Sequence, residues 1–372
     1  MAKKLYIIAG EASGDLHGAN LIKAMLKEDP SLEIRAWGGD KMEAAGAEIV
    51  KHYRDLAFMG FTEVLLNLKT IMRNLKFCKE DIAAFNPDAL ILIDYPGFNM
   101  RIASWAHEKN FKVLYYISPQ IWAWKRKRVY KLKKTVDKMF VILPFEKDFY
   151  KKYDMDVEFV GHPLMDEIDE FKKQARSLEK FKADNKLNEK EIIAVVPGSR
   201  KQEISKILPE MLSLIPRFPN YQFVIAAAPS IDDSFYLSFI KNHEVSIIRS
   251  QTYPLYYHAS AGMVASGTAT LEAAIFGLPE VVCYKGSPIS IMIARSVIKV
   301  KYISLVNLIM DEEMLKELIQ NDLNTEELEK QMSLLLDPSY RADLEKGYTR
   351  LQEKLGGVGA SETAAKAMLK SL

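Results

Sequence analysis

The chain of 372 residues is long for one hydrophobic core, so its length predicts two domains or more. Lys and Arg number 51 against 49 Asp and Glu, which gives no global bias toward nucleic acid. The two cysteines lie far apart without metal-ligand spacing, no signal-peptide pattern precedes the first strand, and the longest uncharged stretch, residues 250–271, is too polar to span a bilayer. We therefore expect a cytoplasmic enzyme.

Short apolar runs alternate with helical patterns along both halves of the chain. The first half contains LYIIAG, EIRAWGG, ALILID, KVLYYIS, KMFVIL and VEFVG, and the second contains EIIAVVPGSR, YQFVIAAAP, EVSIIRS, AGMVASGT and LPEVVCY. Such alternation is typical of parallel α/β sheets. Residues 166–191 hold 15 charged side chains and mark the junction. The sequence predicts two Rossmann-like domains, 1–166 and 167–345, that face a central cleft, and a helical tail, 346–372, that packs on either one.

A glycine turn follows the first strand. Gly10, Gly14 and Gly18 match neither the dinucleotide fingerprint nor the phosphate-binding loop. We expect Asp15 to cap the helix that begins here, which leaves Glu11 to face a neutral polar ligand such as a sugar hydroxyl. The alternative is that the glycines only let helix and strand pack closely.

An apolar band occupies residues 56–75, where few charges interrupt large hydrophobic side chains. Such a band usually belongs to the core. Beside an acyl-chain substrate it could instead shelter the chains or enter a membrane interface. On that hypothesis the contact residues are Leu65, Leu68, Ile71 and Met72.

Asp94 ends the apolar run ALILID, at the edge of the sheet where ligands of such folds bind. A carboxylate there suits a general base that takes a proton from an attacking hydroxyl. The alternative is a turn carboxylate before Tyr95. His17 and His162 are rival bases, although each fits a packed histidine better.

A basic and aromatic run spans residues 122–134, with seven Lys or Arg and no acid. It could bind RNA, lie on an anionic membrane, or form a solvated helix face over buried tryptophans. The nearby apolar band and the balanced total charge favour the membrane over nucleic acid. The residues expected there are Trp122, Trp124, Lys125, Arg126, Lys127 and Arg128.

Two turns after strands of the second half predict a nucleotide-sugar site. Gly198, Ser199 and Arg200 precede one helix, whose free N–H groups and neighbouring guanidinium suit a diphosphate. Ser266, Gly267 and Thr268 form the second turn, and Glu272 follows one helical turn later. Glu272 can accept hydrogen bonds from ribose hydroxyls, or it can belong to a capping box. No Asp-x-Asp pair or His cluster offers a metal site, so we expect independence of metals and no cofactor.

The motifs AGEASGD, IDYPGFN, SPQIWAW, LPFE, GHP, PGSR and SGTATLE occur in this order over nearly the whole chain, which thereby resembles lipid-A-disaccharide synthase. The resemblance implies an inverting glycosyltransferase of the GT-B fold. It would join UDP-2,3-diacylglucosamine to 2,3-diacylglucosamine 1-phosphate through a β-1′,6 linkage and release UDP, at the inner face of the cytoplasmic membrane. A homodimer is compatible with this function.

The resemblance also assigns residues. Glu11 and Ser13 would help to hold sugar, Asp94 would be the base, and Asn307 would contact the donor. Gly97 stands where some relatives carry Asp, and Val306 replaces a usual Pro. The alternatives are another UDP-sugar enzyme of the same fold, such as an epimerase or a lipid glycosyltransferase, and an RNA-binding module.

Overall fold

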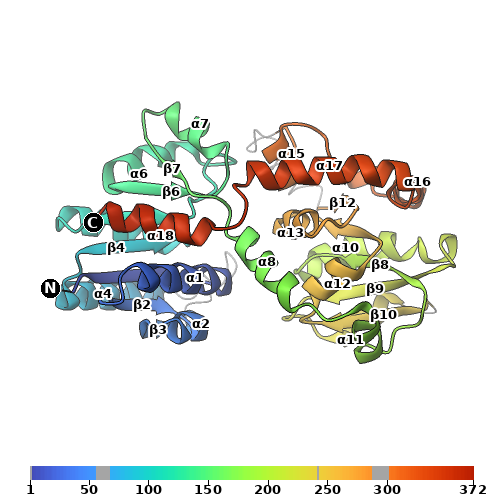
Figure 1. The fold of residues 1–372 in the computed structure, drawn as a ribbon, viewed down its shortest axis with the longest axis horizontal. Coiled ribbons are helices and arrows are strands. Elements are labelled where there is room, and N and C mark those ends of the chain that lie inside the picture. Colours follow the sequence, from blue (N-terminus) through green and yellow to red (C-terminus); the bar gives the residue numbers. More distant parts are fainter. Residues whose placement is uncertain (1, 56–67, 241–242, 287–300) are drawn as a thin grey trace. The chain divides into compact units, whose positions relative to one another are not determined.

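The computed structural model describes residues 2–55, 68–240, 243–286 and 301–372 (Figure 1). The chain divides into two compact units, one of Met1–Asp166 with Leu355–Leu372 and the other of Glu167–Lys354. Both are parallel α/β sheets with helices, so the predicted fold class is confirmed. The predicted cleft between them stays a prediction. Within the described residues, no helix is long and apolar enough to cross a bilayer.

The first unit is built on one parallel sheet with the order β3-β2-β1-β4-β5-β6-β7. Its strands are β1 (Lys4–Ala9), β2 (Glu33–Gly38), β3 (Glu48–His52), β4 (Ala89–Ile93), β5 (Val113–Tyr116), β6 (Lys138–Val141) and β7 (Glu158–Phe159). Its helices are α1 (Ala12–Glu28), α2 (Asp40–Ala44), α4 (Leu68–Phe85), α5 (Pro96–Glu108), α6 (Val129–Thr135), α7 (Glu146–Lys151) and α18 (Ala360–Lys370), with short 3₁₀ turns at Tyr53–Asp55 and Arg126–Arg128. The strand order reverses between β1 and β4, which makes their carboxyl ends the expected ligand-binding edge.

The second unit repeats this plan with the order β10-β9-β8-β11-β12-β13, again parallel. Its strands are β8 (Glu191–Val196), β9 (Tyr221–Ala227), β10 (Val245–Arg249), β11 (Ala261–Ala265), β12 (Glu280–Tyr284) and β13 (Glu317–Ile319). Its helices are α9 (Leu178–Asp184), α10 (Lys201–Leu212), α11 (Asp233–Ile240), α12 (Thr252–His258), α13 (Thr268–Phe276), α15 (Leu305–Met310), α16 (Thr325–Leu335) and α17 (Pro338–Lys354), with 3₁₀ turns at Ile215–Arg217 and Gln320–Asp322; α8 (Leu164–Gln174) spans the division between the units. The reversal lies between β8 and β11.

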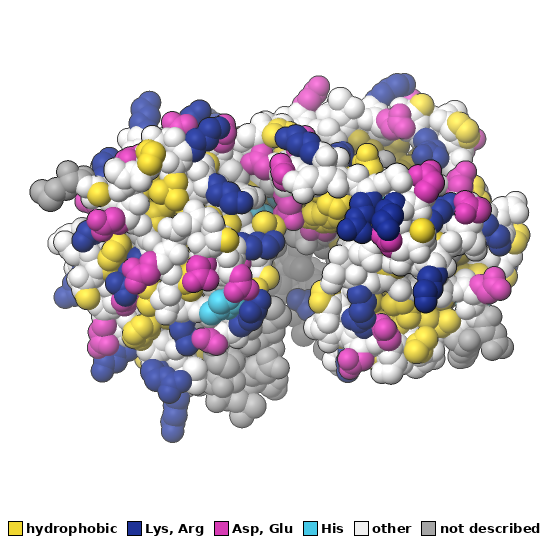
Figure 2. All heavy atoms as spheres, turned by 60° about the horizontal axis from the view of Figure 1, so that its bottom comes forward, with side chains coloured by type: hydrophobic (Ala, Val, Ile, Leu, Met, Phe, Trp, Pro, Cys, Tyr) yellow, Lys and Arg dark blue, Asp and Glu magenta, His cyan; other side chains and the backbone are white. Residues whose placement is uncertain are grey.

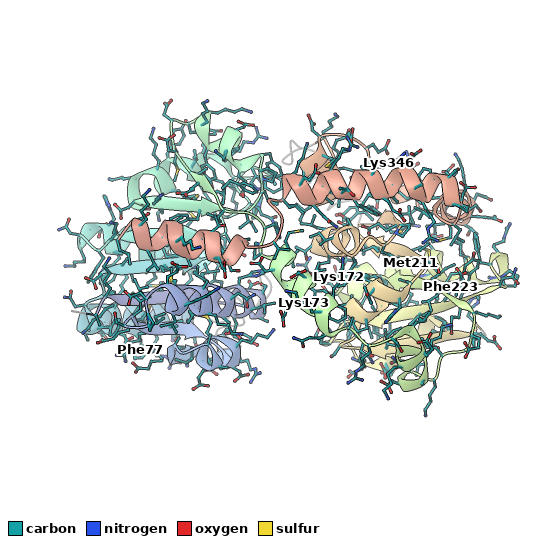
Figure 3. All side chains as sticks on the ribbon, viewed as in Figure 1. Phe77, Lys172, Lys173, Met211, Phe223 and Lys346 are labelled. Carbon is teal, nitrogen blue, oxygen red and sulfur yellow. The ribbon has the colours of Figure 1, made fainter. Side chains whose placement is uncertain are left out.

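Apolar strands make the cores, as their unbroken hydrophobic runs predict. Leu5 to Ala9 and Ala89 to Ile93 are fully buried in the first unit. In the second unit Met211 on α10 and Phe223 on β9 are buried (Figure 3). Burying such side chains supplies the main stabilising term of each unit.

The C-terminal tail is divided differently from the prediction. The expected start at residue 346 falls inside α17, which belongs to the second unit, and only the chain from Leu355 joins the first. There α18 lies beside α1 (Figure 1). The carboxylate of Asp166 accepts hydrogen bonds from the N–H groups of Gly359, Ala360 and Ser361 at 2.5, 3.2 and 2.8 Å, and so caps α18.

Asp15 caps a different helix from the one expected. It is buried within α1, and its carboxylate accepts from the N–H groups of Gly39, Lys41 and Met42 at 2.7, 3.2 and 3.1 Å. These groups open α2. The prediction was wrong because the carboxylate turns to a neighbouring loop that is distant in sequence.

Candidate active site

The chain bends sharply where β4 ends. Asp94 and Tyr95 both have left-handed backbone angles, with φ of 44° and 46°, and Pro96 then opens α5. Such conformations are unfavourable for residues other than glycine and persist where the surroundings enforce them, often at functional sites. This bend places Asp94 at the switch point of the first sheet.

Burial raises the pKa of the Asp94 carboxyl to about 6, and the nearby charge of Glu11 adds to the effect. Glu11 is the exposed residue that precedes α1, and Ala9 pairs with Ile93 across β1 and β4. The two carboxyl groups therefore follow adjacent strands. A carboxyl with this pKa is ionised at neutral pH yet basic enough to take a proton in catalysis.

The rival histidines are poor bases. Burial lowers the pKa of His17 to about 4 and that of His162 to about 3. The Nδ1 atom of His162 also accepts a hydrogen bond from the N–H of Leu164 at 3.3 Å. Both rings are neutral at physiological pH, which fits packed histidines and leaves Asp94 as the candidate base.

The glycines of the first turn make room for neighbours. A Cβ at Gly10 would overlap the ring of Tyr95, and one at Gly14 would lie 3.1 Å from the Cβ of Ala9. Close packing thus accounts for both. Glu11 and Ser13 are exposed at the start of α1, where a ligand can reach them, and their sugar contact stays a prediction.

A pocket of about 260 Å³ lies at the switch point of the second sheet. Most of the residues predicted for the nucleotide sugar line it together: Gly198, Ser199, Ser266, Gly267, Thr268 and Glu272. The sequence reasoning missed other lining residues, among them Glu203, Thr252 and Tyr256. Thr252 could have been found, because it follows a strand of the same sheet.

Glu272 is the fifth residue of α13, whose N-cap is Gly267. The capping-box alternative places a Glu at the third helical position, and Thr270 stands there instead, with its hydroxyl donating to the carbonyl of Gly267 at 2.8 Å. Burial, with the charge of Glu167 second, raises the pKa of Glu272 to about 7. Glu272 is therefore a carboxyl with a raised pKa on the wall of the pocket.

A carboxylate already occupies part of the predicted diphosphate cradle. The N–H of Ser199 donates to Oε2 of Glu203 at 3.2 Å, and Gly198, with φ of 105°, leaves no room there for a Cβ. Arg200 is the N-cap of α10 and its side chain is exposed. An anion bound at this turn would therefore meet Glu203 as well as Arg200.

Metal binding finds no support in the described ranges, where no three His, Cys, Asp or Glu side chains gather in a group that could hold an ion. Independence of metals stays a prediction. On this expectation the cations and N–H groups of the protein must stabilise a departing diphosphate.

Comparison with known proteins assigns the family. The sequence model described as lipid-A-disaccharide synthetase matches residues 5–371. A lipid-A-disaccharide synthase of Geobacter metallireducens is 38% identical over 377 residues, which cover 100% of this chain and 97% of that protein. The chain belongs to the lipid-A-disaccharide synthetase family. Another synthase, from Syntrophus aciditrophicus, is 38% identical over 98% of this chain and 96% of its own length. The protein is thus a glycosyltransferase of lipid A biosynthesis, as its motifs predict.

Solved structures share the architecture at low identity. A putative UDP-N-acetylglucosamine 2-epimerase from Listeria monocytogenes is similar with a TM-score of 0.71 and 14% identity, over 100% of this chain and 96% of that one. The calicheamicin glycosyltransferase CalG4 gives a TM-score of 0.61 at 15% identity, over 100% and 98%. These similarities establish the fold of this family member.

Asn307, which the family resemblance assigns to the donor, is fully buried. Its Nδ2 donates to the carbonyl of Leu315 at 2.8 Å and to Oε1 of Glu317 at 2.9 Å, and its Oδ1 accepts from the N–H of Leu315 at 2.9 Å. These bonds hold the segment before β13. A donor contact by Asn307 stays a prediction.

The two tryptophans of the basic run differ. Trp122 is only 7% exposed and packs edge-on against Phe145, which fits the alternative of a buried tryptophan, and its predicted membrane contact stays a prediction. Trp124 is 46% exposed, with the ammonium of Lys125 4.2 Å from its ring centre. Lys125, Arg126 and Lys127 are exposed. One tryptophan thus anchors the loop to the core, and the other stays at the surface beside the cations.

The predicted acyl-chain band is only partly described. Leu65 and the side chain of Leu68 lie outside the described residues. On α4, Ile71 packs against the core, whereas Met72 is 63% exposed and Phe77, also on this helix, is partly exposed (Figure 3). The described end of the band thus has one core-facing side and one exposed side.

Proposed function

We propose that this synthetase-family protein transfers 2,3-diacylglucosamine from UDP to the 6-hydroxyl of 2,3-diacylglucosamine 1-phosphate. The acceptor oxygen O6 forms a bond to C1 of the donor with inversion, which gives the β-1′,6 linkage. The bond from C1 to the diphosphate oxygen breaks, and UDP leaves with the electron pair. The hydroxyl proton passes to the carboxylate of Asp94.

The observation that carries this proposal is the position and pKa of Asp94. The carboxyl stands at the switch point of the first sheet, and burial together with Glu11 brings its pKa to about 6. In the second unit, the pocket with Glu272 and the Ser199 and Thr268 turns suits a nucleotide sugar. Some solved neighbours, such as the Neisseria meningitidis epimerase bound to UDP-GlcNAc, contain such a ligand, which supports the same ligand class here.

The direct test uses the purified protein with UDP-2,3-diacylglucosamine and 2,3-diacylglucosamine 1-phosphate. Mass spectrometry should find UDP and the disaccharide 1-phosphate in equal amounts. Each sugar substrate alone is the control and should yield no disaccharide. Epimerised UDP-sugar without disaccharide would contradict the proposal and favour the epimerase alternative.

Glu272→Gln is expected to weaken UDP binding by about 10- to 100-fold, because hydrogen bonds to a charged acceptor contribute more than neutral ones. Calorimetry with UDP measures the change. At lower pH the wild-type affinity should also fall, since Glu272 becomes protonated below a pKa of about 7.

Glu280→Gln is the matched control for Glu272→Gln. Glu280 is fully buried on β12 outside the pocket lining, and burial raises the pKa of its carboxyl well above the usual range. Its substitution should leave the affinity for UDP unchanged. Unchanged affinity in Glu272→Gln as well would remove Glu272 from the proposed site.

We further propose that the basic run binds an anionic membrane at the cytoplasmic face. Exposed Trp124 and Tyr130 can enter the interface while the neighbouring cations meet the headgroups. On the face drawn in Figure 2, Lys and Arg lie among Asp and Glu. Residues 122–134 hold seven Lys or Arg and no acid, which suits a contact with anionic lipid.

Replacing Lys125, Arg126 and Lys127 with Gln should lower binding to anionic vesicles by up to about 100-fold at low salt, at about 1 kcal/mol for each charge. The difference should shrink as salt rises. Vesicle sedimentation measures it, and turnover on detergent-dispersed short-chain substrate should survive.

The matched control removes the same number of charges at Lys173, Lys330 and Lys346. Each is exposed and lies within 4 Å of an acid one helical turn away, and two of them are labelled in Figure 3. This control should bind vesicles as the wild type does. If the variant with Gln at positions 125–127 binds vesicles normally but loses turnover, the basic run belongs to the active site instead.

A further inference from the structure

The carbonyl oxygen of Asp94 receives two side-chain donors. The hydroxyl of Tyr115 donates to it at 2.6 Å, and Nδ2 of Asn99 donates to it at 2.9 Å. Tyr115 comes from the adjacent strand β5 and Asn99 from the first turns of α5. The bend that carries the candidate base is thus held from two elements.

Asn99 also ties the two strands of the switch point together. Its Nδ2 lies 3.1 Å from the carbonyl oxygen of Ile93 at the end of β4 and 3.4 Å from that of Ile8 on β1. Its Oδ1 is buried and accepts no hydrogen bond within the described part of the chain. Burying an amide oxygen without a partner is costly. The hydrogen bonds that Nδ2 donates are therefore what Asn99 contributes to this bend.

Tyr115 acts as a donor to the Asp94 carbonyl. Its side chain is fully buried, and burial raises the pKa of its hydroxyl well above the usual range, so the proton stays on the oxygen. The hydroxyl is directed at a backbone carbonyl and leaves the Asp94 carboxylate available for chemistry. A donor at that carbonyl fixes the backbone without competing for the catalytic proton.

We propose that Tyr115 and Asn99 are positioning residues, which hold the left-handed backbone of Asp94 and Tyr95 and thereby place the Asp94 carboxylate for proton transfer. This inference rests on the proposed function, in which Asp94 is the base. Two consecutive residues with positive φ relax readily unless hydrogen bonds restrain them, and a displaced base transfers protons poorly.

Tyr115→Phe removes only the donating oxygen and keeps the buried ring. Turnover should fall by about 10- to 100-fold, as for a misplaced catalytic group, while the KM for the UDP-sugar stays unchanged. Tyr116→Phe is the matched control: Tyr116 is the next residue of β5, is equally buried, and its hydroxyl bonds to no residue that the structure describes. It should leave turnover unchanged.

A double-mutant cycle separates positioning from any other role. In the Asp94→Asn background, Tyr115→Phe should cause no further loss, because there is no base left to place. Asn99→Ala should give the same pattern, and it tests the inference should Tyr115→Phe fail to fold. An equal loss with and without Asp94 would overturn the inference, as would Tyr115→Phe behaving like Tyr116→Phe.

The same variants distinguish a failure of Asp94 as the base from a failure of Tyr115 as a positioning residue. If Asp94→Asn alone turns over like the wild type, the proposed function is wrong in its base, whatever Tyr115 does. If Asp94→Asn is inactive and both tyrosine variants are active, the base stands and the positioning role is overturned.

Discussion

Asp94→Asn is expected to lower turnover by about 100-fold or more while the affinity for UDP stays unchanged, because the amide keeps the volume but cannot take the proton. Initial rates of UDP release measure turnover, and calorimetry measures UDP affinity. His17→Gln is the control for the rival base. A neutral histidine with a pKa of about 4 should be dispensable for proton transfer.

The pH profile follows from the same carboxyl. The base must be ionised, so kcat at saturating substrate, where the affinity for UDP no longer matters, should fall about tenfold for each unit below pH 6 and level off above it. Glu11→Gln removes a negative charge that raises the pKa of Asp94, so the acidic limb should move to lower pH. A profile that is flat between pH 5 and 7 would contradict Asp94 as the base.

Ionisation of Asp94 as the pH rises should increase activity and decrease the stability of the fold. The folded-state pKa of Asp94, about 6, exceeds its ordinary value of 3.8, so the folded form binds this proton more tightly than the unfolded form. The ionised group therefore destabilises the fold as the pH rises between these values, and the cost is complete at neutral pH. Asp94→Asn should raise the Tm at pH 7, as is typical when a functional group is held in an unfavourable setting.

The sequence predicts features that depend on local pattern. Unbroken apolar runs between helical segments predict two buried parallel sheets, since strands covered on both faces need apolar side chains throughout. Turns that follow such strands meet at one edge, which is why Ser199 and Thr268 could be placed in one pocket although they are 69 positions apart.

Features that depend on a distant partner could not be predicted. Asp15 caps α2 because Gly39 and Met42 are brought to it by the packing of β1 and β2. Trp122 is buried because Phe145, from another loop, covers it. The carboxylate of Glu203 reaches Ser199 within the very turn predicted for a diphosphate, and residue types alone do not give that orientation. The left-handed bend at Asp94 and Tyr95 also could not be predicted, because neither residue is glycine and the bend is held by Tyr115 and Asn99.

Arg200→Ala is expected to lower turnover by about 100- to 1,000-fold, which corresponds to roughly 3 to 4 kcal/mol of lost transition-state stabilisation. Charge builds up on the diphosphate as the bond to C1 breaks, and Glu203 at the same turn would make that charge less favourable unless a cation offsets it. Arg200, exposed at the N-cap of α10, is the nearest cation in sequence to that turn. Single-turnover rates measure the chemical step.

Lys201→Ala is the matched control, because the adjacent ammonium lies 5.5 Å from the ring centre of Phe235 and is engaged there. Its removal should leave turnover nearly unchanged. The turnover of Arg200→Lys should lie between those of Arg200→Ala and Lys201→Ala. Lysine keeps the charge but lacks the planar guanidinium that matches phosphate oxygens. A loss in Arg200→Ala that appears only in the KM for the acceptor, with kcat intact, would mean that Arg200 binds the acceptor phosphate and that another group stabilises the leaving UDP.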